Sequence, residues 1–296
     1  NLDLDAPYEE VRGAETNLKR MGKRAARVDE PLEETRKESF FTEGSEALQE
    51  ARVWVSRDSL RRAALRLKDE RERIERECAD VATHEASHRD LATRLRGVQN
   101  QLSNFGDERP ISFVTFSPGS SVIATGSWSA LIKLWSVPDC RSLAVLKGHG
   151  ERISGLAWHP EACSTLPPTG PNLVSASCDG TARLWSLEGA KLGELTGHVG
   201  RLSRVAFHPS GRLVATAGFD TTWRLWDVET CREVMLQEGH TRSLYAVAVH
   251  PDGSLVASAG LDAVVRLWDL RTGRSVQTFQ GHVKQVLGLD FAPSGV

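Results

Sequence analysis

The stretch Gly197-His198, followed by Asp220 and then Trp226, decides the fold of this chain. The same three elements occur twice more, as Gly148-His149, Asp179 and Trp185 and as Gly239-His240, Asp262 and Trp268. The last tryptophans of the three sets are separated by 41 and 42 residues, and Trp135 is a fourth copy of that element. One such tryptophan carries little information, but a set that recurs in register indicates an internal structural repeat.

A glycine–histidine pair, an aspartate and a tryptophan that recur every roughly 40–45 residues are typical of a WD-repeat β-propeller, in which each repeat forms one four-stranded blade. The sequence therefore predicts an all-β WD40 propeller over residues 109–296, with four blades and the start of a fifth at Val286–Phe291. Because an incomplete ring leaves raw sheet edges, we expect the propeller to continue beyond the C-terminus of this chain, with seven blades in the full protein.

The recurring polar residues are predicted to be structural. In each repeat the histidine, the aspartate, a hydroxyl on the second strand and the tryptophan should form a buried hydrogen-bonded relay, because a buried carboxylate must be paired. The expected relays are His149, Asp179, Ser175 and Trp185; His198, Asp220, Thr216 and Trp226; and His240, Asp262, Ser258 and Trp268. These residue types also compose a catalytic triad, but three copies at the spacing of the fold favour scaffolding. We predict no catalytic, cofactor or metal site.

The first repeat departs from this pattern. Ser129 occupies the position of the aspartate, and no glycine–histidine pair precedes the repeat. We expect this blade to be held partly by the incoming helix or by the missing last blade.

The loops at one rim of the propeller are the candidate partner-binding surface. The residue before each turn aspartate is apolar, and each glycine–histidine loop adds a basic side chain, an arginine or a lysine. The predicted rim comprises Trp128, Arg152, Arg201, Phe219, Arg242, Leu261 and Lys284. Aromatic and arginine side chains are typical of protein-interface hot spots and also suit phosphate contacts. The alternative is ordinary loop decoration.

Charge is concentrated in the N-terminal part of the chain: 45 of the first 110 residues are charged, against 31 of the remaining 186. This shift places a boundary near Arg109-Pro110. Residues 1–38 are interpreted as a segment that is disordered or ordered by a partner. Its basic cluster over residues 19–27 is either a nuclear address or RNA contact, or a solvated patch. Residues 39–108 should form a helical region.

Within that region the sequence predicts two short helices, one capped by Ser45 and one by Asp58 or Ser59, and then a long helix from Ile74 to about Phe105. Apolar residues and histidines follow steps of three and four along the long helix, which predicts a stripe that docks on the propeller or on another protein. The stripe consists of Val81, His84, His88, Leu91, Leu95, Val98, Leu102 and Phe105.

Residues 84–88, His-Glu-Ala-Ser-His, match the HExxH pattern of zinc proteases. Both histidines belong to the apolar stripe, and no third histidine follows at metzincin spacing. We therefore favour packing over zinc binding, with a zinc peptidase as an alternative.

Composition argues against several other classes of protein, namely highly charged nucleic-acid-binding, disulfide-rich and membrane-spanning proteins. The net charge is −2, which predicts no wholesale attraction to nucleic acid or membrane. The five cysteines are scattered without a CxxC pair, which favours a reducing compartment. No apolar run approaches the ~18 residues of a membrane span. The chain begins at Asn1 rather than at methionine, so we expect it to derive from a longer parent protein.

Several stretches resemble one family in particular. They include Arg109-Pro110-Ile111-Ser112, Phe116-Ser117-Pro118, Trp128-Ser129, residues 134–140 (Leu-Trp-Ser-Val-Pro-Asp-Cys), residues 208–212 (His-Pro-Ser-Gly-Arg), residues 222–227 (Thr-Trp-Arg-Leu-Trp-Asp), residues 237–240 (Gln-Glu-Gly-His), and the segments 260–263 and 268–274. Upstream, residues 43–44, 51–55 and 60–63 also match. The chain resembles the WD-repeat subunit of the spliceosomal U4/U6 small nuclear ribonucleoprotein, the Prp4-type family, from about residue 39 to its end.

The resemblance implies a non-enzymatic scaffold subunit of the U4/U6 and U4/U6·U5 tri-snRNP particles that acts in pre-mRNA splicing in the nucleus. It implies as partners the Prp3-type subunit, a cyclophilin expected near residues 1–44, U4/U6 snRNA within the particle and other tri-snRNP proteins. The residues themselves leave open a WD scaffold of another complex, such as a G-protein β-like signalling subunit or a ubiquitin-ligase substrate receptor.

Overall fold

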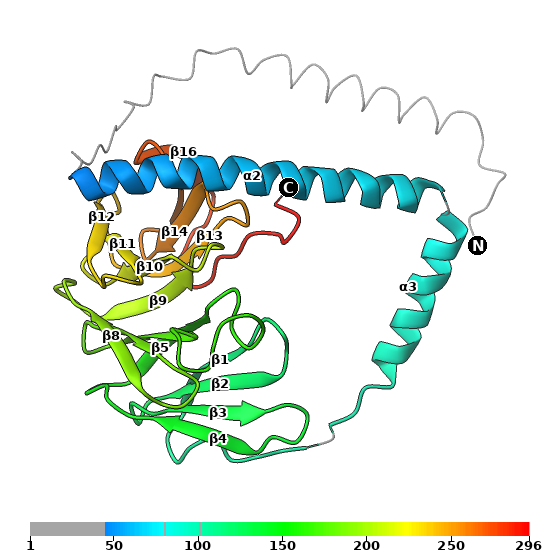
Figure 1. The fold of residues 1–296 in the computed structure, drawn as a ribbon, viewed down its shortest axis with the longest axis horizontal. Helices are drawn as coiled ribbons and strands as arrows, with labels where there is room; N and C mark the ends of the chain where they lie inside the picture. Colours follow the sequence, from blue (N-terminus) through cyan, green and yellow to red (C-terminus); the bar gives the residue numbers. More distant parts are fainter. Residues whose placement is uncertain (1–44, 80, 101, 296) are drawn as a thin grey trace, which may run out of the picture. The chain divides into compact units, whose positions relative to one another are not determined.

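The computed structural model describes residues 45–79, 81–100 and 102–295, which belong to one compact unit, Phe40–Val296. Two helices, α2 (Glu46–Ala79) and α3 (Val81–Arg96), precede a long series of strands (Figure 1). The charged segment 1–38, with its basic cluster, lies outside the described residues, as do residues 39–44 of the expected helical region. No helix in the described part of the chain is long and apolar enough to cross a membrane.

Within the described residues, sixteen strands form four antiparallel sheets, each built in sequence order. The first sheet contains β1 (Ile111–Phe116), β2 (Val122–Ser127), β3 (Ile132–Ser136) and β4 (Ser142–Leu146). The second contains β5 (Ile153–Trp158), β6 (Leu173–Ser177), β7 (Ala182–Trp185) and β8 (Lys191–Leu195). The third contains β9 (Leu202–Phe207), β10 (Leu213–Gly218), β11 (Trp223–Asp227) and β12 (Glu233–Gln237). The fourth contains β13 (Leu244–Val249), β14 (Leu255–Gly260), β15 (Val264–Asp269) and β16 (Arg274–Gln280).

The sheets stack face to face around their first strands. Strand β5 contacts both β1 and β9, and β9 also contacts β13. Apolar clusters fill the spaces between successive sheets, and Trp185, Trp226 and Trp268 are at most 2% exposed within them. Four such sheets after a helical region confirm the predicted propeller fold.

Helix α2 packs on the third and fourth sheets. Ser45 caps its first turn by accepting a hydrogen bond from the Leu48 backbone N–H at 3.3 Å, as predicted. Leu48 and Val55 are buried in the same cluster as Trp223 and Trp268. Burial of these two side chains stabilises the docked helix by roughly 3–6 kcal/mol on an area basis. The helix is therefore part of the propeller's core rather than an independent element.

The two short helices expected before residue 74 are one continuous helix, so that prediction was wrong. Asp58 does not begin a helix, because its carboxylate pairs with Arg62 one turn later at 2.7 Å. Ser59 does not cap either, since its hydroxyl donates to the Ser56 carbonyl at 3.2 Å. Both polar side chains are satisfied inside a helix, so neither interrupts it.

The long helix predicted from Ile74 to Phe105 is also corrected. Residues 74–79 belong to α2, and α3 ends at Arg96. Gly97 follows directly, and glycine is the residue that most often terminates helices. Leu91, Leu95 and Phe105 are 49%, 61% and 95% exposed, so this part of the stripe does not dock on the propeller. The option that it meets another protein stays a prediction.

The expected fifth blade is not formed in the described residues. The segment after β16 contains no strand through residue 295. It nevertheless follows the fourth sheet, because the Val286 N–H donates to the Gly260 carbonyl at 3.0 Å. A strand requires a pairing partner along its length, and one hydrogen bond to the end of β14 does not provide one.

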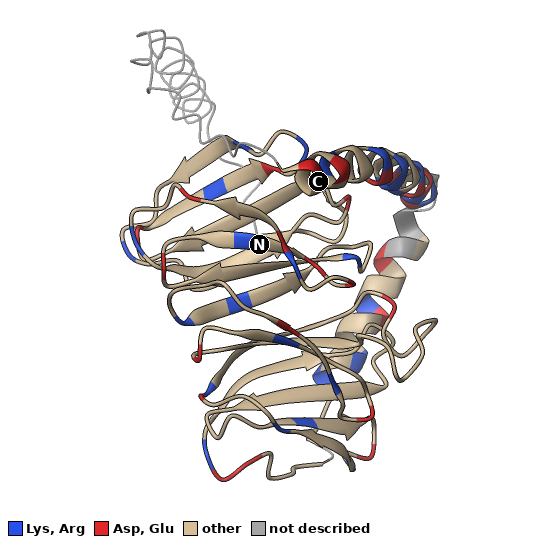
Figure 2. Ribbon diagram, turned by 60° about the vertical axis from the view of Figure 1, so that its left-hand side comes forward, with Lys and Arg blue, Asp and Glu red and all other residues tan. Residues whose placement is uncertain are grey.

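Charged side chains are dense on α2 and sparse on the strands (Figure 2). The uneven distribution of charge along the sequence therefore corresponds to the division between the helical region and the sheets.

Candidate functional site

The predicted polar relays are assembled in three sheets. In the second sheet the His149 Nδ1 lies 2.9 Å from the Asp179 carboxylate, and its Nε2 lies 2.7 Å from the Ser175 hydroxyl. The Trp185 indole N–H donates to the same hydroxyl at 2.8 Å. The hydroxyl has one proton and already accepts from the tryptophan, so it can donate to a neutral histidine whose Nδ1–H faces the aspartate.

The third and fourth sheets repeat this geometry. His198 lies 2.8 Å from both Asp220 and Thr216, and Trp226 donates to Thr216 at 2.8 Å. In the fourth sheet His240 lies 2.7 Å from both Asp262 and Ser258, and Trp268 donates to Ser258 at 2.8 Å.

The electrostatics of the relays follow from their partners. Burial opposes ionisation of Asp220, but hydrogen bonds from His198 and Thr222 outweigh it and lower the Asp220 pKa to about 2. The same balance, with burial opposed by His149 and Thr181, holds the pKa of Asp179 well below its ordinary range. Burial lowers the pKa of His240, against the effect of Asp262. A neutral histidine that donates to an ionised aspartate is the consistent state.

The histidines and hydroxyls of the relays are closed to solvent, with Ser175, Thr216 and Ser258 at 0% exposure. The side chains of His149, His198 and His240 are 0–1% exposed. Their hydrogen-bonding atoms are occupied by partners from the same repeat, so no substrate can reach a nucleophile here. A triad requires an accessible hydroxyl beside its histidine, and this geometry does not offer one.

The first sheet has a modified version of the relay. Trp135 donates to Thr125 at 2.9 Å, as in the other sheets. The carboxylate comes from Asp107, which accepts a hydrogen bond from Ser129 and pairs with Lys133 at 3.4 Å. Burial works against ionisation of Asp107, but hydrogen bonds from Ser127, Ser129 and the Glu108 backbone, together with the charge of Lys133, lower its pKa to about 2. In this repeat the carboxylate of Asp107 stands at the position of the relay histidine, and Ser129 stands at the position of the relay aspartate.

Sequence reasoning missed Asp107 although a signal was present. Gly106-Asp107 precedes Ile111 by the same five positions that separate Gly197-His198 from Leu202. The connector, rather than the incoming helix, therefore holds this blade.

A second set of histidines links neighbouring sheets and was not singled out from the sequence. His208 donates from Nε2 to the Gly253 carbonyl of the next repeat at 2.8 Å, and His250 lies 3.3 Å from the Gly295 carbonyl. Burial lowers the pKa of His208 to about 4, so it is neutral. The signal is the repeated His-Pro pair, with a left-handed glycine in the following repeat at Gly253 and Gly295.

The predicted rim residues fall into two groups. Trp128, Arg152 and Phe219 surround one hollow of about 240 Å³, together with Tyr245 and Arg204. The remaining four do not line it: Arg201, Arg242 and Lys284 are exposed, and Leu261 is half-buried. Arg204 and Tyr245 were not predicted, because they lie on the first strands rather than on the loops.

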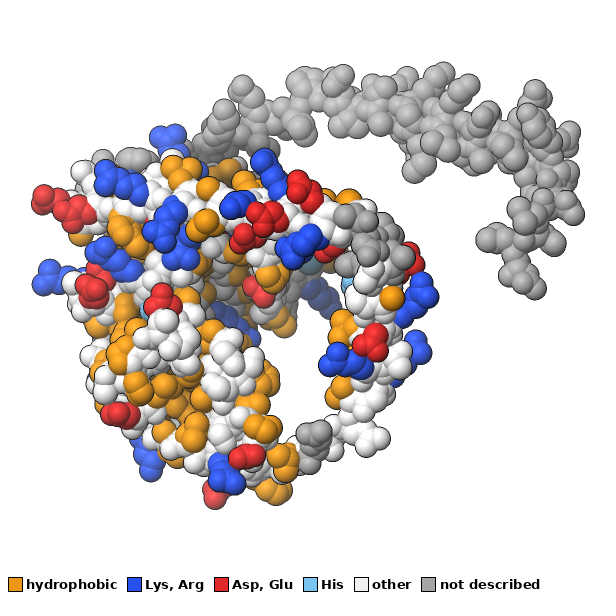
Figure 3. Space-filling model, turned by 45° about the vertical axis from the view of Figure 1, so that its right-hand side comes forward, with side chains coloured by type: hydrophobic (Ala, Val, Ile, Leu, Met, Phe, Trp, Pro, Cys, Tyr) orange, Lys and Arg blue, Asp and Glu red, His pale blue; other side chains and the backbone are white. Residues whose placement is uncertain are grey.

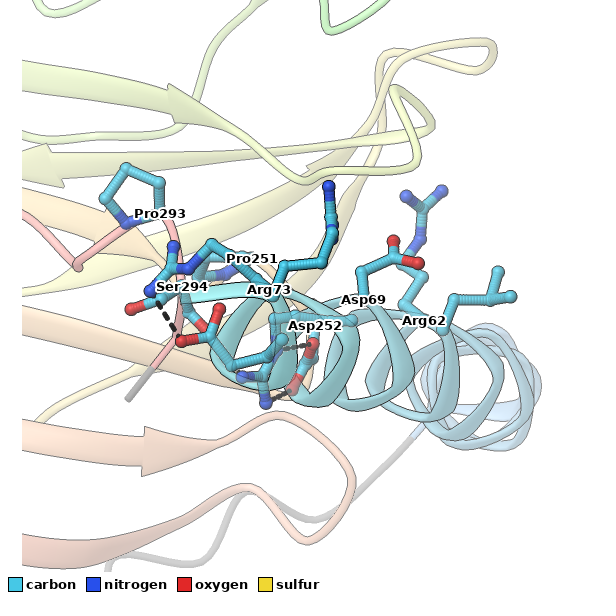
Figure 4. A pocket seen from close by; sticks show the side chains of 11 residues that line it. Arg62, Asp69, Arg73, Pro251, Asp252, Pro293 and Ser294 are labelled. Atoms are coloured by element: carbon cyan, nitrogen blue, oxygen red, sulfur yellow. Dashed lines mark hydrogen bonds and ion pairs between the residues drawn. The ribbon is translucent and has the colours of Figure 1, made fainter. Parts of the chain in front are cut away.

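A second hollow of about 580 Å³ lies between α2 and the turns at Pro251-Asp252 and Pro293-Ser294 (Figure 4). Arg66 binds Asp252 through two hydrogen bonds of 2.7 and 2.8 Å, and it also donates to the Ser294 carbonyl. Pairing with Arg66 lowers the Asp252 pKa. This contact fastens the helix to the propeller.

The HExxH pattern lies on α3. His88 is exposed, and the side chain of His84 lies outside the described residues. Among the described residues no group of three histidine, cysteine or acidic side chains could hold a metal.

The family model for the WD domain, G-beta repeat, matches residues 99–136, 140–186, 189–227 and 231–269. The chain belongs to the WD40-repeat family. The first match begins before β1 and includes Asp107, in agreement with its place in the first WD40 relay.

Several relatives of this WD40 chain are named as Prp4-type proteins of the U4/U6 small nuclear ribonucleoprotein. The U4/U6 small nuclear ribonucleoprotein Prp4 of Bos taurus is 41% identical over 158 residues, covering 52% of this chain and 30% of the relative. The U4/U6 small nuclear ribonucleoprotein PRP4 of Saccharomyces cerevisiae is 33% identical over 231 residues, covering 76% of this chain and 48% of the relative. The U4/U6 small nuclear ribonucleoprotein PRP4-like protein of Arabidopsis thaliana is 42% identical over 155 residues, covering 52% of this chain and 26% of the relative.

These relatives confirm the resemblance to a Prp4-type WD-repeat protein. The chain spans less than half the length of each of these curated relatives.

Proposed function

We propose that this chain is part of a non-enzymatic scaffold subunit of the U4/U6 small nuclear ribonucleoprotein, acting in pre-mRNA splicing in the nucleus. The observation that carries the proposal is the agreement of relatives from animal, fungus and plant, all named for that particle, with a WD40 fold. The names of these relatives support a splicing-associated WD protein. We further propose that the subunit also belongs to the tri-snRNP.

The internal geometry is consistent with a scaffold. The relay histidines and carboxylates are used to hold sheets together, and the rim displays exposed side chains of the kind that bind partners. We propose that the rim residues Trp128, Arg152, Arg201, Phe219, Arg242, Leu261 and Lys284 face protein partners of the particle. The Prp3-type subunit, a cyclophilin and other tri-snRNP proteins are the candidates that the family resemblance supplies, with U4/U6 snRNA present in the same particle.

Co-purification tests the proposed function. The intact parent protein, tagged in its own cells and isolated at moderate salt, should bring U4 and U6 snRNAs above the level of an unrelated nuclear WD40 protein. A G-protein β-like subunit or a ubiquitin-ligase receptor would bring neither RNA. Recovery of signalling or ligase subunits without spliceosomal RNA would overturn the proposal in favour of that alternative.

A further inference from the structure

The 240 Å³ hollow at the rim gathers side chains from all four sheets. Trp128 comes from the turn after β2, and Arg152 from the residue before β5. Arg204 belongs to β9, Phe219 follows β10, and Tyr245 belongs to β13. Phe219 and Tyr245 contact each other with ring centroids 5.1 Å apart. The hollow therefore has aromatic walls and two guanidinium groups.

The contacts of the two guanidinium groups in the described part of the chain are with rings, a sulfur and a carbonyl oxygen. Arg152 donates to the Cys178 sulfur at 3.2 Å and lies over the Trp128 ring, 5.0 Å from its centroid. Arg204 donates to the Ser154 carbonyl at 2.5 Å and lies 4.5 Å from the centroid of Phe113. Among the described residues no ion pair to an acidic side chain involves either arginine.

This arrangement is electrostatically incomplete. Arg204 is half-buried, and burial alone lowers its pKa. A cation that leaves water without gaining an anion costs free energy, whereas a carboxylate brought to it would form a charge-assisted hydrogen bond. Elsewhere in the chain a partly buried arginine is neutralised by a carboxylate of the same chain, as Arg66 is by Asp252.

The size of the hollow limits its occupant. Its volume is below the range of about 300–1,000 Å³ typical of small-molecule and cofactor pockets. It suits one or two side chains of a larger partner. Aromatic walls additionally suit the aliphatic part of an acidic side chain or an apolar neighbour.

RNA is the less favoured occupant. Binding of single-stranded RNA requires a row of cations that follows the backbone. The lining of the hollow supplies only two cations, Arg152 and Arg204, which do not make such a row. On the face of the molecule drawn in Figure 3, basic and acidic side chains are interspersed.

We propose that this hollow binds an aspartate or glutamate side chain from an extended segment of a partner protein, with Arg152 and Arg204 as the carboxylate's donors. The inference rests on the proposed role of the rim as a protein-binding surface. It adds the chemical class of the bound segment and the two residues that select it.

An array of acidic octapeptides tests the proposal. Each peptide is paired with its amide counterpart, in which every glutamate becomes glutamine and every aspartate asparagine, and a ten-residue oligouridylate is included. The tagged chain should bind a subset of the acidic peptides at least about tenfold more tightly than their amide counterparts. Fluorescence anisotropy with the best labelled peptide gives the affinity.

Arg204→Gln and Arg152→Gln should each weaken that peptide at least about tenfold, whereas Arg232→Gln, a change at an exposed arginine outside the hollow, should leave it unchanged. Arg204→Gln removes contacts with Ser154 and Phe113, so each variant's thermal unfolding is measured first. If Arg204→Gln does not fold, Arg152→Gln decides.

Three outcomes would overturn the proposal: no preference for acidic over amide peptides, a preference that survives both folded variants, or binding of the oligouridylate alone with the same arginine dependence. Recovery of U4 and U6 snRNAs by the parent protein together with any of these outcomes would reject the acidic-segment site while leaving the proposed function intact.

Discussion

Replacing Thr216 by valine isolates the contribution of one relay. Thr216 is fully buried, accepts a hydrogen bond from Trp226 at 2.8 Å and lies 2.8 Å from the His198 Nε2. Valine has nearly the same shape but no hydroxyl, so packing is preserved while two buried nitrogens lose their partner. Each unsatisfied buried group costs about 1–3 kcal/mol, so the loss of two partners predicts a destabilisation of about 2–6 kcal/mol for Thr216→Val.

Urea unfolding followed by tryptophan fluorescence measures this change. Thr196→Val is the matched control, because Thr196 is exposed at the end of β8, and its effect should stay within about 0.5 kcal/mol. Equal unfolding midpoints for Thr216→Val and the wild type would refute the reasoning, since the buried relay would then contribute nothing to stability.

Three further predictions concern the face bound by α2. Because burial lowers the His208 pKa to about 4, below the ~6.5 of an unfolded histidine, His208 stabilises the fold above pH ~6.5. This contribution is lost as pH falls from about 6.5 to about 4, so His208→Gln should flatten the pH dependence of the urea midpoint there. Arg66→Gln leaves the Asp252 carboxylate, 9% exposed, without its cation. It should cost about 1–3 kcal/mol and speed hydrogen exchange in α2. Gly253→Ala places a Cβ 2.3 Å from the His208 Nε2 at φ +79°, so it should lower the thermal midpoint by several degrees, whereas Gly119→Ala, with nothing within 4 Å, should not.

The sheets were predictable because their signals are local and repeated. Each strand is a short apolar run bounded by turn residues, so the four-stranded repeat can be recognised from the sequence alone. The relays were predictable for the same reason: His198, Asp220 and Trp226 recur at spacings that only the fold explains.

The helical region was predicted less well because tertiary contacts decide it. The side of α2 that faces the propeller carries Leu48 and Val55 but also Arg66, whose partner Asp252 lies 186 residues away. A charged residue on a docking face breaks the apolar periodicity that sequence reasoning uses. The stripe of α3, including Leu91 and Leu95, has that periodicity and yet is exposed.

Some of the residues that line the hollow at the rim could be predicted from the sequence, and others could not. Trp128, Arg152 and Phe219 stand at repeat positions that the rim occupies, so the sequence suggested them. Arg204 and Tyr245 lie on first strands, where alternation alone does not tell which side chains reach the shared hollow. Only the relative placement of four sheets brings them together.

The division between a stabilising interior and a partner-binding rim is tested most directly by charge reversal at Arg201 and Arg242 in the parent protein. The double Arg→Glu variant should unfold at the wild-type temperature, because both side chains are exposed. It should nevertheless bring down less of the Prp3-type subunit and of U4/U6 snRNA than the wild type, at matched expression. A folded variant that recovers every partner and both RNAs at wild-type levels would contradict the account.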